Sequence, residues 1–375
     1  MGKPKILFIN SLPNFYRCGF FNALEQVFDT NVLFTKRREE ACNRPPSFFY
    51  NMKEAKFSYE FAHGVRLGKY KFSFNVPWIA RQHFDCRVVG LLDDLISLRV
   101  AEYFIESDKP FLLSLDGVGR RSQLVDFAYS RYIEAAEACL SPSEMTDDYI
   151  RDLSSSRKTI YRYPLSSFSR KEIDPRPASQ EEKAELKSCF GLERDVPVLL
   201  GVGQVIPRKG FDCLVEALRL IFMPVCLLIV GGESIELEKV LSATAPQHKV
   251  LFVRDVKHDE LSRYYRAADI FVLPTRGDSW GLVVPEAMSH GLPVVTTTAC
   301  GAGVELVTKD TGMLVKPDDV KELANALLKL LITPDLRNEM GQNGISRVGT
   351  WTIEGMAEAT SEIIFSYLNT MKTRG

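Results

Sequence analysis

Short apolar runs alternate with amphipathic stretches along both halves of the chain. Residues 5–10 (KILFIN) form an apolar run bounded by Ser11 and Pro13, which predicts a buried parallel strand. Further strands are predicted over residues 31–35, 87–90 and 110–115, and helices over residues 20–28 and 91–107. Strands that alternate with helices are typical of an α/β sheet with right-handed crossovers. Residues 43–80 are aromatic and basic and show no clear period.

A second series of the same kind starts near Val196. The pattern predicts strands over residues 198–203, 225–230, 250–253, 270–273, 293–296 and 313–315. It predicts helices over residues 211–221, 235–241, 259–267, 282–290 and 320–332. This series indicates a second doubly wound domain. Residues 166–195, rich in Ser, Pro and charge, are interpreted as the linker, and two such domains leave a cleft between them.

Composition and charge exclude several classes of protein. The chain has 375 residues, of which 45% are hydrophobic and 25% charged, as in an ordinary globular protein. The net charge of -1 argues against a nucleic-acid binder that works through bulk charge. The eight cysteines stand singly, which signals no zinc site or disulfide framework and favours a reducing compartment.

Targeting signals are not recognised, so a cytoplasmic protein is expected. The apolar stretch after Lys5 is too short for a signal peptide, and residues 220–232 are too short to span a bilayer. Residues 1–172 carry 25 Lys+Arg and 21 Asp+Glu, a net of +4, and residues 173–375 carry 22 and 27, a net of -5. This split is either chance or a sign that the first half faces an anionic partner, such as a membrane surface.

The first candidate site is a glycine-containing loop over residues 201–210 (GVGQVIPRKG). Ligands bind doubly wound sheets at the carboxyl ends of the strands, and this loop follows a predicted strand. Arg208 and Lys209 stand just before the next helix, where two cations suit a diphosphate. The alternative is a solvated basic turn.

The second candidate site is residues 278–286 (DSWGLVVPE), between a predicted strand and a helix. Pro285 fits only in the first turn of that helix, so the backbone near Gly281 can face a phosphate. Glu286 can accept two hydroxyl donors from a ribose, and Asp278 can accept hydroxyls from a sugar. The alternatives are that Glu286 only complements the helix dipole and that Asp278 only caps the helix.

These motifs resemble a known family of enzymes. A series of five segments is similar to the donor-binding domain of retaining, GT-B-fold glycosyltransferases of the family-4 type (glycosyl transferases group 1). The segments are, in order, VGQVIPRKGFDCLVEAL, LIVGGES, ELSRYYRAADIFVLPTRGDSWGLVVPEAMSHGLPVVTT, GAGVELV and GMLV. PNFYRCGFFNAL resembles the opening loop and helix of the capsule- and exopolysaccharide-type members. Trp351 and residues 354–369 resemble the family's last helix.

The resemblance implies a GT-B architecture, with two Rossmann-like doubly wound α/β domains facing a central cleft. Residues 1–172, completed by a C-terminal helix over residues 354–375, would be the acceptor-side domain. Residues 173–353 would bind the nucleotide-sugar donor. No cofactor and no metal are expected, since no D-x-D triplet is present and cations can neutralise the diphosphate.

The resemblance also assigns roles to individual residues. Arg208 and Lys209 would bind the diphosphate, Glu286 the ribose and Asp278 the donor sugar. The remaining donor-binding residues would be Gly19 in the opening loop, Gly203, Arg254 and Val256 near the base, and Gly281, Leu282 and Val283 through their backbone. Asp278, Gln204 and Asp116 depart from the family pattern. Asp116 stands where a His that contacts the sugar is usual and would replace it, so the expected catalytic residues are Asp278, Glu286 and Asp116.

The expected function is retaining, metal-independent transfer of a hexose from a UDP- or GDP-sugar to a saccharide acceptor. The acceptor is expected to be lipid-linked and to belong to surface polysaccharide synthesis at the inner face of the cell membrane. Two alternatives stay open, a nucleotide-sugar 2-epimerase and a non-catalytic binder of glycan or nucleotide-sugar. A dehydrogenase is disfavoured because no G-x-G-x-x-G follows the first strand.

Overall fold

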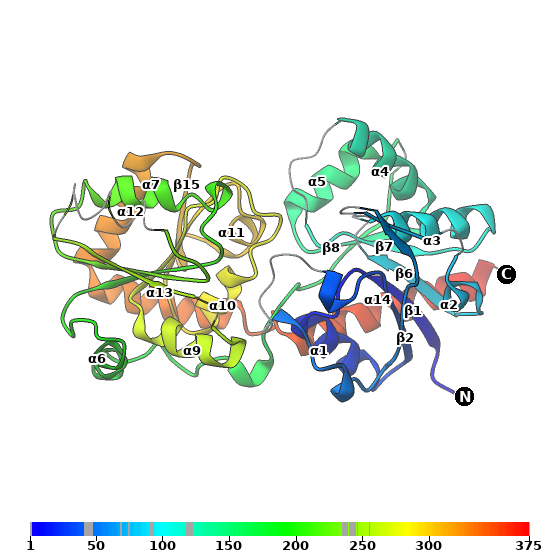
Figure 1. The fold of residues 1–375 in the computed structure, drawn as a ribbon, viewed down its shortest axis with the longest axis horizontal. Helices are drawn as coiled ribbons and strands as arrows, with labels where there is room; N and C mark the ends of the chain where they lie inside the picture. Colours follow the sequence, from blue (N-terminus) through cyan, green and yellow to red (C-terminus); the bar gives the residue numbers. More distant parts are fainter. Residues whose placement is uncertain are drawn as a thin grey trace. The chain divides into compact units, whose positions relative to one another are not determined.

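The computed structural model places most of the chain in two compact units (Figure 1). It describes residues 2–40, 48–67, 70–73, 76–90, 94–117, 123–155, 157–234, 239, 245, 247–254 and 256–374. The first unit comprises Met1–Ser167 and Thr352–Gly375, and the second comprises Phe168–Trp351. The division therefore falls slightly before the predicted boundary at residue 172. No helix among the residues that the structure describes is long and apolar enough to cross a membrane.

The first unit is built on a seven-stranded sheet in the order β3-β2-β1-β6-β7-β8-β9. Every neighbouring pair is parallel. The strands are β1 (Lys5–Asn10), β2 (Asp29–Phe34), β3 (Ser58–Phe61), β6 (Cys86–Gly90), β7 (Leu112–Ser114), β8 (Ala138–Ser141) and β9 (Ile160–Arg162). The strand order reverses between β1 and β6, which is the point where doubly wound sheets bind ligands.

Helices and a small antiparallel pair of strands complete the described part of the first unit. They are α1 (Phe15–Leu24), α2 (Trp78–Arg81), α3 (Leu95–Glu106), α4 (Gln123–Ala135), α5 (Glu144–Leu153) and α14 (Ile353–Arg374), the turns η1 (Arg38–Glu40) and η3 (Met52–Glu54), and the antiparallel pair β4 (Val65–Leu67) and β5 (Tyr70–Phe72). The C-terminal helix α14 packs on α1.

The helix predicted over residues 20–28 is placed wrongly, because α1 begins and ends earlier. Asn14 caps α1, and its side chain accepts a hydrogen bond from the Arg17 backbone N–H at 2.9 Å. An Asn at this position satisfies a donor that the first turn leaves unpaired, so the helix starts directly after it. Residues 43–80, which had no prediction, supply the edge strand β3 within their described part.

The second unit has a six-stranded parallel sheet in the order β12-β11-β10-β13-β14-β15. The strands are β10 (Val198–Val202), β11 (Cys226–Val230), β12 (Lys249–Val253), β13 (Ile270–Leu273), β14 (Val294–Thr297) and β15 (Gly312–Val315). Each lies within two residues of its predicted range. With the first sheet, this confirms the predicted α/β class with two Rossmann-like sheets.

Helices cover both faces of the second sheet (Figure 1). They are α6 (Gln180–Cys189), α7 (Phe211–Leu218), α9 (His258–Ala267), α10 (Val283–Ser289), α11 (Gly301–Leu306), α12 (Val320–Ile332) and α13 (Pro334–Arg347), with the turns η4 (Arg170–Glu172) and η5 (Pro207–Lys209). Helices α7 and α12 pack together and share a fully buried cluster that includes Phe211, Leu227 and Leu327. Helix α6 packs on α9. The helix predicted over residues 235–241 lies outside the described residues, apart from Lys239.

The interpretation of residues 166–195 as a linker is wrong for most of that range. Helix α6 lies inside it and belongs to the second unit. Lys183 and Lys187 of α6 are buried, and their ammonium groups lie 3.1 and 2.9 Å from the two carboxylate oxygens of Asp269. The same carboxylate accepts the Val198 backbone N–H at 2.9 Å. The two lysines, whose charge suggested a solvated linker, therefore attach α6 through Asp269 to the start of β10.

Replacement of Asp269 by Asn should destabilise the second unit. Two buried ammonium groups would lose the carboxylate that they share, which we expect to cost about 3 kcal/mol or more in the free energy of unfolding. Urea denaturation followed by circular dichroism measures this. The control is Glu216→Gln, whose partner Arg219 is 44% exposed, and it should lower stability by less than about 1 kcal/mol. Equal losses in both variants would contradict the assignment.

Candidate active site

The loop between β10 and α7 approaches the end of β13 very closely. Gly210 has φ of +71°, and a Cβ at this position would lie 2.0 Å from the Pro274 carbonyl oxygen. Only glycine combines this backbone conformation with this contact. Across the junction, the Arg208 carbonyl oxygen accepts hydrogen bonds from the Arg276 backbone N–H at 2.8 Å and from the Thr275 hydroxyl at 3.0 Å. The two candidate loops found in the sequence therefore lie side by side.

Lys209 and Asp278 form an ion pair at this junction. The Lys209 ammonium lies 2.6 Å from Asp278 Oδ2, and the two side chains are 12% and 14% exposed. The Arg208 guanidinium is 3.5 Å from Asp278 Oδ1 and donates to the Gly277 carbonyl oxygen at 2.6 Å. Gly203 has φ of +139°, and a Cβ at this position would lie 3.4 Å from Lys209 Cε, so Gly203 lies beside the lysine side chain.

Asp278 does not cap the helix that follows it. Helix α10 begins after Leu282 and has no side-chain cap, so the capping alternative is not supported. The Asp278 backbone is instead tied to the start of α11, because its N–H donates to the Ala299 carbonyl and its carbonyl accepts the Gly301 N–H. Gly281 has φ of +94°, and a Cβ there would lie 2.7 Å from Cys300 Sγ. The backbone near Gly281, Leu282 and Val283 is thus held in a tight turn.

Glu286 lies in the first turn of α10 and is only 6% exposed. The buried Tyr265 hydroxyl of α9 donates to Glu286 Oε2 at 2.8 Å. Burial, together with the charge of Glu286, raises the pKa of Tyr265 well above its usual value, so this tyrosine stays a donor. The Tyr265 ring stacks on His290, with ring centroids 5.0 Å apart. The sequence reading missed Tyr265, because nothing in the α9 pattern says which aromatic residue points to Glu286.

A second pair of residues near Glu286 also escaped the sequence analysis. His258, at the start of α9, lies 3.0 Å from the Glu172 carboxylate of η4. Burial works against the charged forms of both groups. The bond to Glu172 and the charge of Glu286 nevertheless raise the pKa of His258, and bonds from His258 and Ser169 lower the pKa of Glu172 to about 2.

Arg254 and Val256 follow the end of β12, and Asp255 between them lies outside the described residues. The Arg254 guanidinium pairs with Glu233, which follows the glycine pair at the end of β11. The Arg254 side chain is 69% exposed, so it remains accessible to solvent although it pairs with Glu233.

In the first unit, the structure corrects the prediction for Gly19. This residue is not in a loop but in the middle of α1, and a Cβ there would lie 3.3 Å from Ile353 Cδ1 of α14. The glycine therefore allows two helices to pack closely, which is a structural reason for its presence.

Asp116 follows β7, and its carboxylate is already engaged within the first unit. It forms an ion pair with the buried Arg17 of α1, and it accepts the buried Tyr163 hydroxyl at 2.6 Å. Burial and the Asp116 charge raise the pKa of Tyr163 above its usual range. The Asp116 side chain is only 15% exposed, and its carboxylate is bound by Arg17 and Tyr163.

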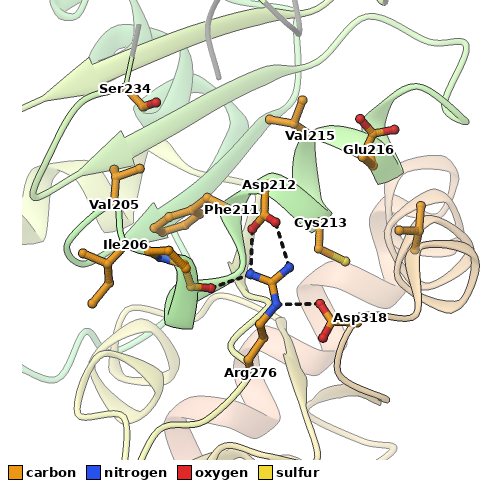
Figure 2. A pocket seen from close by; sticks show the side chains of 12 residues that line it. Val205, Ile206, Phe211, Asp212, Cys213, Val215, Glu216, Ser234, Arg276 and Asp318 are labelled. Atoms are coloured by element: carbon orange, nitrogen blue, oxygen red, sulfur yellow. Dashed lines mark hydrogen bonds and ion pairs between the residues drawn. The ribbon is translucent and has the colours of Figure 1, made fainter. Parts of the chain in front are cut away.

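A cavity of about 600 Å³ lies beside the same loop junction (Figure 2). Arg276 faces it, with hydrogen bonds of 2.9 and 2.7 Å to Asp212 and of 2.7 Å to Asp318. The other lining residues are Val205, Ile206, Pro207, Phe211, Cys213, Val215, Glu216, Ser234 and Val320. None of Lys209, Asp278 and Glu286 lines this cavity, so it is separate from the candidate site. Arg276 joins α7 to the loops after β13 and β15.

Part of the chain is similar in sequence to a known family of glycosyl transferases. Residues 182–347 match the family described as Glycosyl transferases group 1. The chain is 33% identical over 201 residues to a GDP-mannose-dependent monoacylated alpha-(1-6)-phosphatidylinositol monomannoside mannosyltransferase from Corynebacterium glutamicum, which covers 51% of this chain and 52% of that relative. The chain thus spans about half the length of this relative.

A longer alignment and a structural match extend the similarity to the first unit. A D-inositol 3-phosphate glycosyltransferase from Xylanimonas cellulosilytica is 29% identical over 318 residues, which is 81% of this chain and 72% of that one. The Anabaena protein HepE, solved in complex with UDP, superposes with a TM-score of 0.76 at 18% identity over 96% of this chain and all of that one. The chain therefore has the fold of GT-B glycosyltransferases, in which each of two units is built on a Rossmann-like parallel sheet.

The pair of His258 and Glu172 should make stability depend on pH. The raised pKa of His258 means that its contribution is complete below pH 6.5 and is lost as the pH rises through the folded value. The lowered pKa of Glu172 means that its contribution is complete above pH 4.5 and is lost as the pH falls toward 2. His258→Gln should therefore lower the free energy of unfolding most near pH 5, by up to about 1 kcal/mol, and least near pH 8.

Urea denaturation of wild type and variant at both pH values measures this difference. His83, which is 88% exposed, offers the matched control His83→Gln, with no comparable pH dependence expected. A His258 effect that grows toward pH 8 would contradict the assignment.

Proposed function

We propose that this chain, whose residues 182–347 match the family of group 1 glycosyl transferases, moves a hexose from a nucleotide-sugar to a saccharide acceptor. The observation that carries the proposal is that Lys209, Asp278 and Glu286 all follow the carboxyl ends of two adjacent strands, β10 and β13, and that Lys209 pairs with Asp278 there. A cation for a diphosphate and carboxylates for hydroxyl groups are the groups that a nucleotide-sugar requires.

The donor would bind mainly on the second unit. Lys209 and Arg208 would contact the diphosphate, together with the backbone of Gly281, Leu282 and Val283. The buried Glu286 is oriented by Tyr265 and would accept the ribose hydroxyls. Arg254 and Val256, at the end of β12, would lie near the base. The relatives support either nucleotide, since one is named for GDP-mannose and the structural match was solved with UDP.

The chemistry requires charge stabilisation on the leaving group. The bond between the anomeric carbon and the diphosphate oxygen breaks, and a bond from that carbon to an acceptor oxygen forms. The acceptor hydroxyl gives its proton to the departing diphosphate, and we propose that the anomeric configuration is retained. Lys209 and Arg208 are held in place before the reaction by the contacts described above, so they can stabilise the negative charge as it grows.

The acceptor is proposed to be a lipid-linked saccharide that approaches the first unit. Two observations support this choice: the net charge of +4 over residues 1–172, from 25 Lys+Arg and 21 Asp+Glu, and the name of the corynebacterial relative, which describes a phosphatidylinositol acceptor. Positive charge favours contact with anionic headgroups at the inner face of a membrane. A role in surface polysaccharide synthesis is part of the same proposal. Asp116 is not given a catalytic role, because Arg17 and Tyr163 hold its carboxylate.

Glu286→Gln should weaken donor binding and transfer while the protein stays folded. Gln keeps the size of the side chain and can still accept from Tyr265, but it loses the negative charge that strengthens two hydrogen bonds to the ribose. We expect donor affinity to fall at least about tenfold, since a charged hydrogen bond contributes roughly 1.5–3 kcal/mol. Calorimetry with UDP- and GDP-sugars and release of nucleoside diphosphate measure the two effects.

The matched control is Glu339→Gln, an exposed acid on α13 that should change neither quantity. Wild-type donor affinity in the Glu286 variant would overturn the ribose assignment. Conversion of the donor to an epimer without acceptor would indicate the 2-epimerase alternative, and binding with no turnover in any acceptor extract would indicate a non-catalytic binder.

Transfer should continue in excess EDTA. Lys209 and Arg208 would supply the positive charge that a divalent ion provides in other transferases, so chelation should change the rate by less than about twofold. The measurement is nucleoside diphosphate release with and without chelator. A loss of activity that magnesium or manganese restores would contradict this expectation.

A further inference from the structure

The contact between Lys209 and Asp278 joins two groups that need different parts of the donor. Lys209 is the cation for the diphosphate and Asp278 the carboxylate for the sugar, yet they lie 2.6 Å apart and pair with each other. Each side chain is at most 14% exposed, so solvent screens their attraction only weakly. A diphosphate that binds the Lys209 ammonium must therefore either break the ion pair between Lys209 and Asp278 or bind while that pair persists.

The surroundings make it hard for Asp278 to move away. Its backbone is bound on both sides, through the Ala299 carbonyl and the Gly301 N–H. Its second carboxylate oxygen faces Arg208 at 3.5 Å. Because the carboxylate stays near Lys209, a diphosphate bound there would meet a fixed negative charge, which opposes binding.

We propose that Asp278 competes with the diphosphate for Lys209 and thereby makes the site favour the nucleotide-sugar over the free nucleoside diphosphate. This inference rests on the proposed function. A nucleotide-sugar brings hydroxyl groups that can donate to Asp278 and replace Lys209 as its partner. A free nucleoside diphosphate carries hydroxyl groups only on its ribose, which Glu286 is proposed to bind. The Asp278 carboxylate, once separated from Lys209, therefore gains no new hydrogen-bond donor from it. Asp278 is thus a specificity-determining residue that weakens retention of the product.

The competing explanation is that Asp278 only orients Lys209 toward the phosphate. In that case loss of the carboxylate would leave a disordered lysine, and free nucleoside diphosphate and nucleotide-sugar would both bind more weakly. The two explanations predict opposite signs for the change in affinity of the free diphosphate, so one measurement separates them.

The test is calorimetric titration of wild type and Asp278→Asn with UDP, GDP and the corresponding glucose and mannose nucleotides. The variant should bind the nucleoside diphosphate about fivefold more tightly or better, since one competing ion pair has been removed. It should bind the nucleotide-sugar no more tightly than wild type. In steady-state kinetics, the inhibition constant of the free diphosphate should fall while kcat decreases.

A double-mutant cycle shows whether the effect acts through Lys209. In a Lys209→Gln background, Asp278→Asn should change diphosphate affinity by less than about twofold, because the pair is already broken. The matched control is Asp310→Asn, which removes the same charge just before β15, at the opposite edge of the sheet, and should leave the affinities unchanged. If the Asn variant fails to fold in a thermal melt, Asp278→Ser serves the same comparison.

The outcomes separate the inference from the proposed function. If wild type binds neither UDP nor GDP in free or sugar-linked form, both are overturned. If wild type binds them but the Asp278 variant holds the free diphosphate equally or less tightly, only the competition is overturned. Tighter binding of the free diphosphate that disappears in the Lys209→Gln background supports it.

Discussion

The candidate site depends on the close approach of Gly210 to the Pro274 carbonyl at the carboxyl edge of the second sheet. A side chain at Gly210 would occupy the space of that carbonyl, and its φ of +71° is unfavourable for other residues. This contact places the loop after β10 against the loop after β13. Lys209 can reach Asp278 only because the two loops meet there, and the sheet order puts β10 next to β13.

Two ion-pair systems hold this junction from separate sides. Lys209 and Arg208 converge on Asp278 where the donor is proposed to bind. Arg276, two residues before Asp278, binds Asp212 and Asp318 beside the separate cavity. The first system contains the groups that a ligand would use, and the second ties the same loop to α7 and to the loop before α12. A loop fixed in this way can present a reactive pair without large rearrangement, which is what electrostatic preorganisation requires.

The first unit contains a comparable pairing with a different consequence. Asp116 follows β7 at the carboxyl edge of its sheet, but Arg17 and Tyr163 are both buried against it and hold its carboxylate. Asp278 is paired with two loop cations, Lys209, which is 12% exposed, and Arg208, which is 50% exposed. The difference in the burial of the partners explains why Asp278 is assigned to the ligand and Asp116 to the internal cluster.

The sequence by itself determined the strands of the second unit and the two loops that follow β10 and β13. The reason is local: short apolar runs, several of them bounded by glycine or proline, identify buried strands, and the spacing of Asp278 and Glu286 is visible in the chain. Helix α6 was missed because its charged residues look solvated until Asp269, far away in sequence, is brought to them. Gly19 was assigned to a loop because a glycine signals a turn as readily as close helix packing, and only the position of Ile353 decides between them. Tyr265 contacts Glu286, His258 contacts Glu172, and Lys209 contacts Asp278 across separate elements of the second unit. These contacts depend on how the chain folds back on itself, so they leave no pattern in the local sequence.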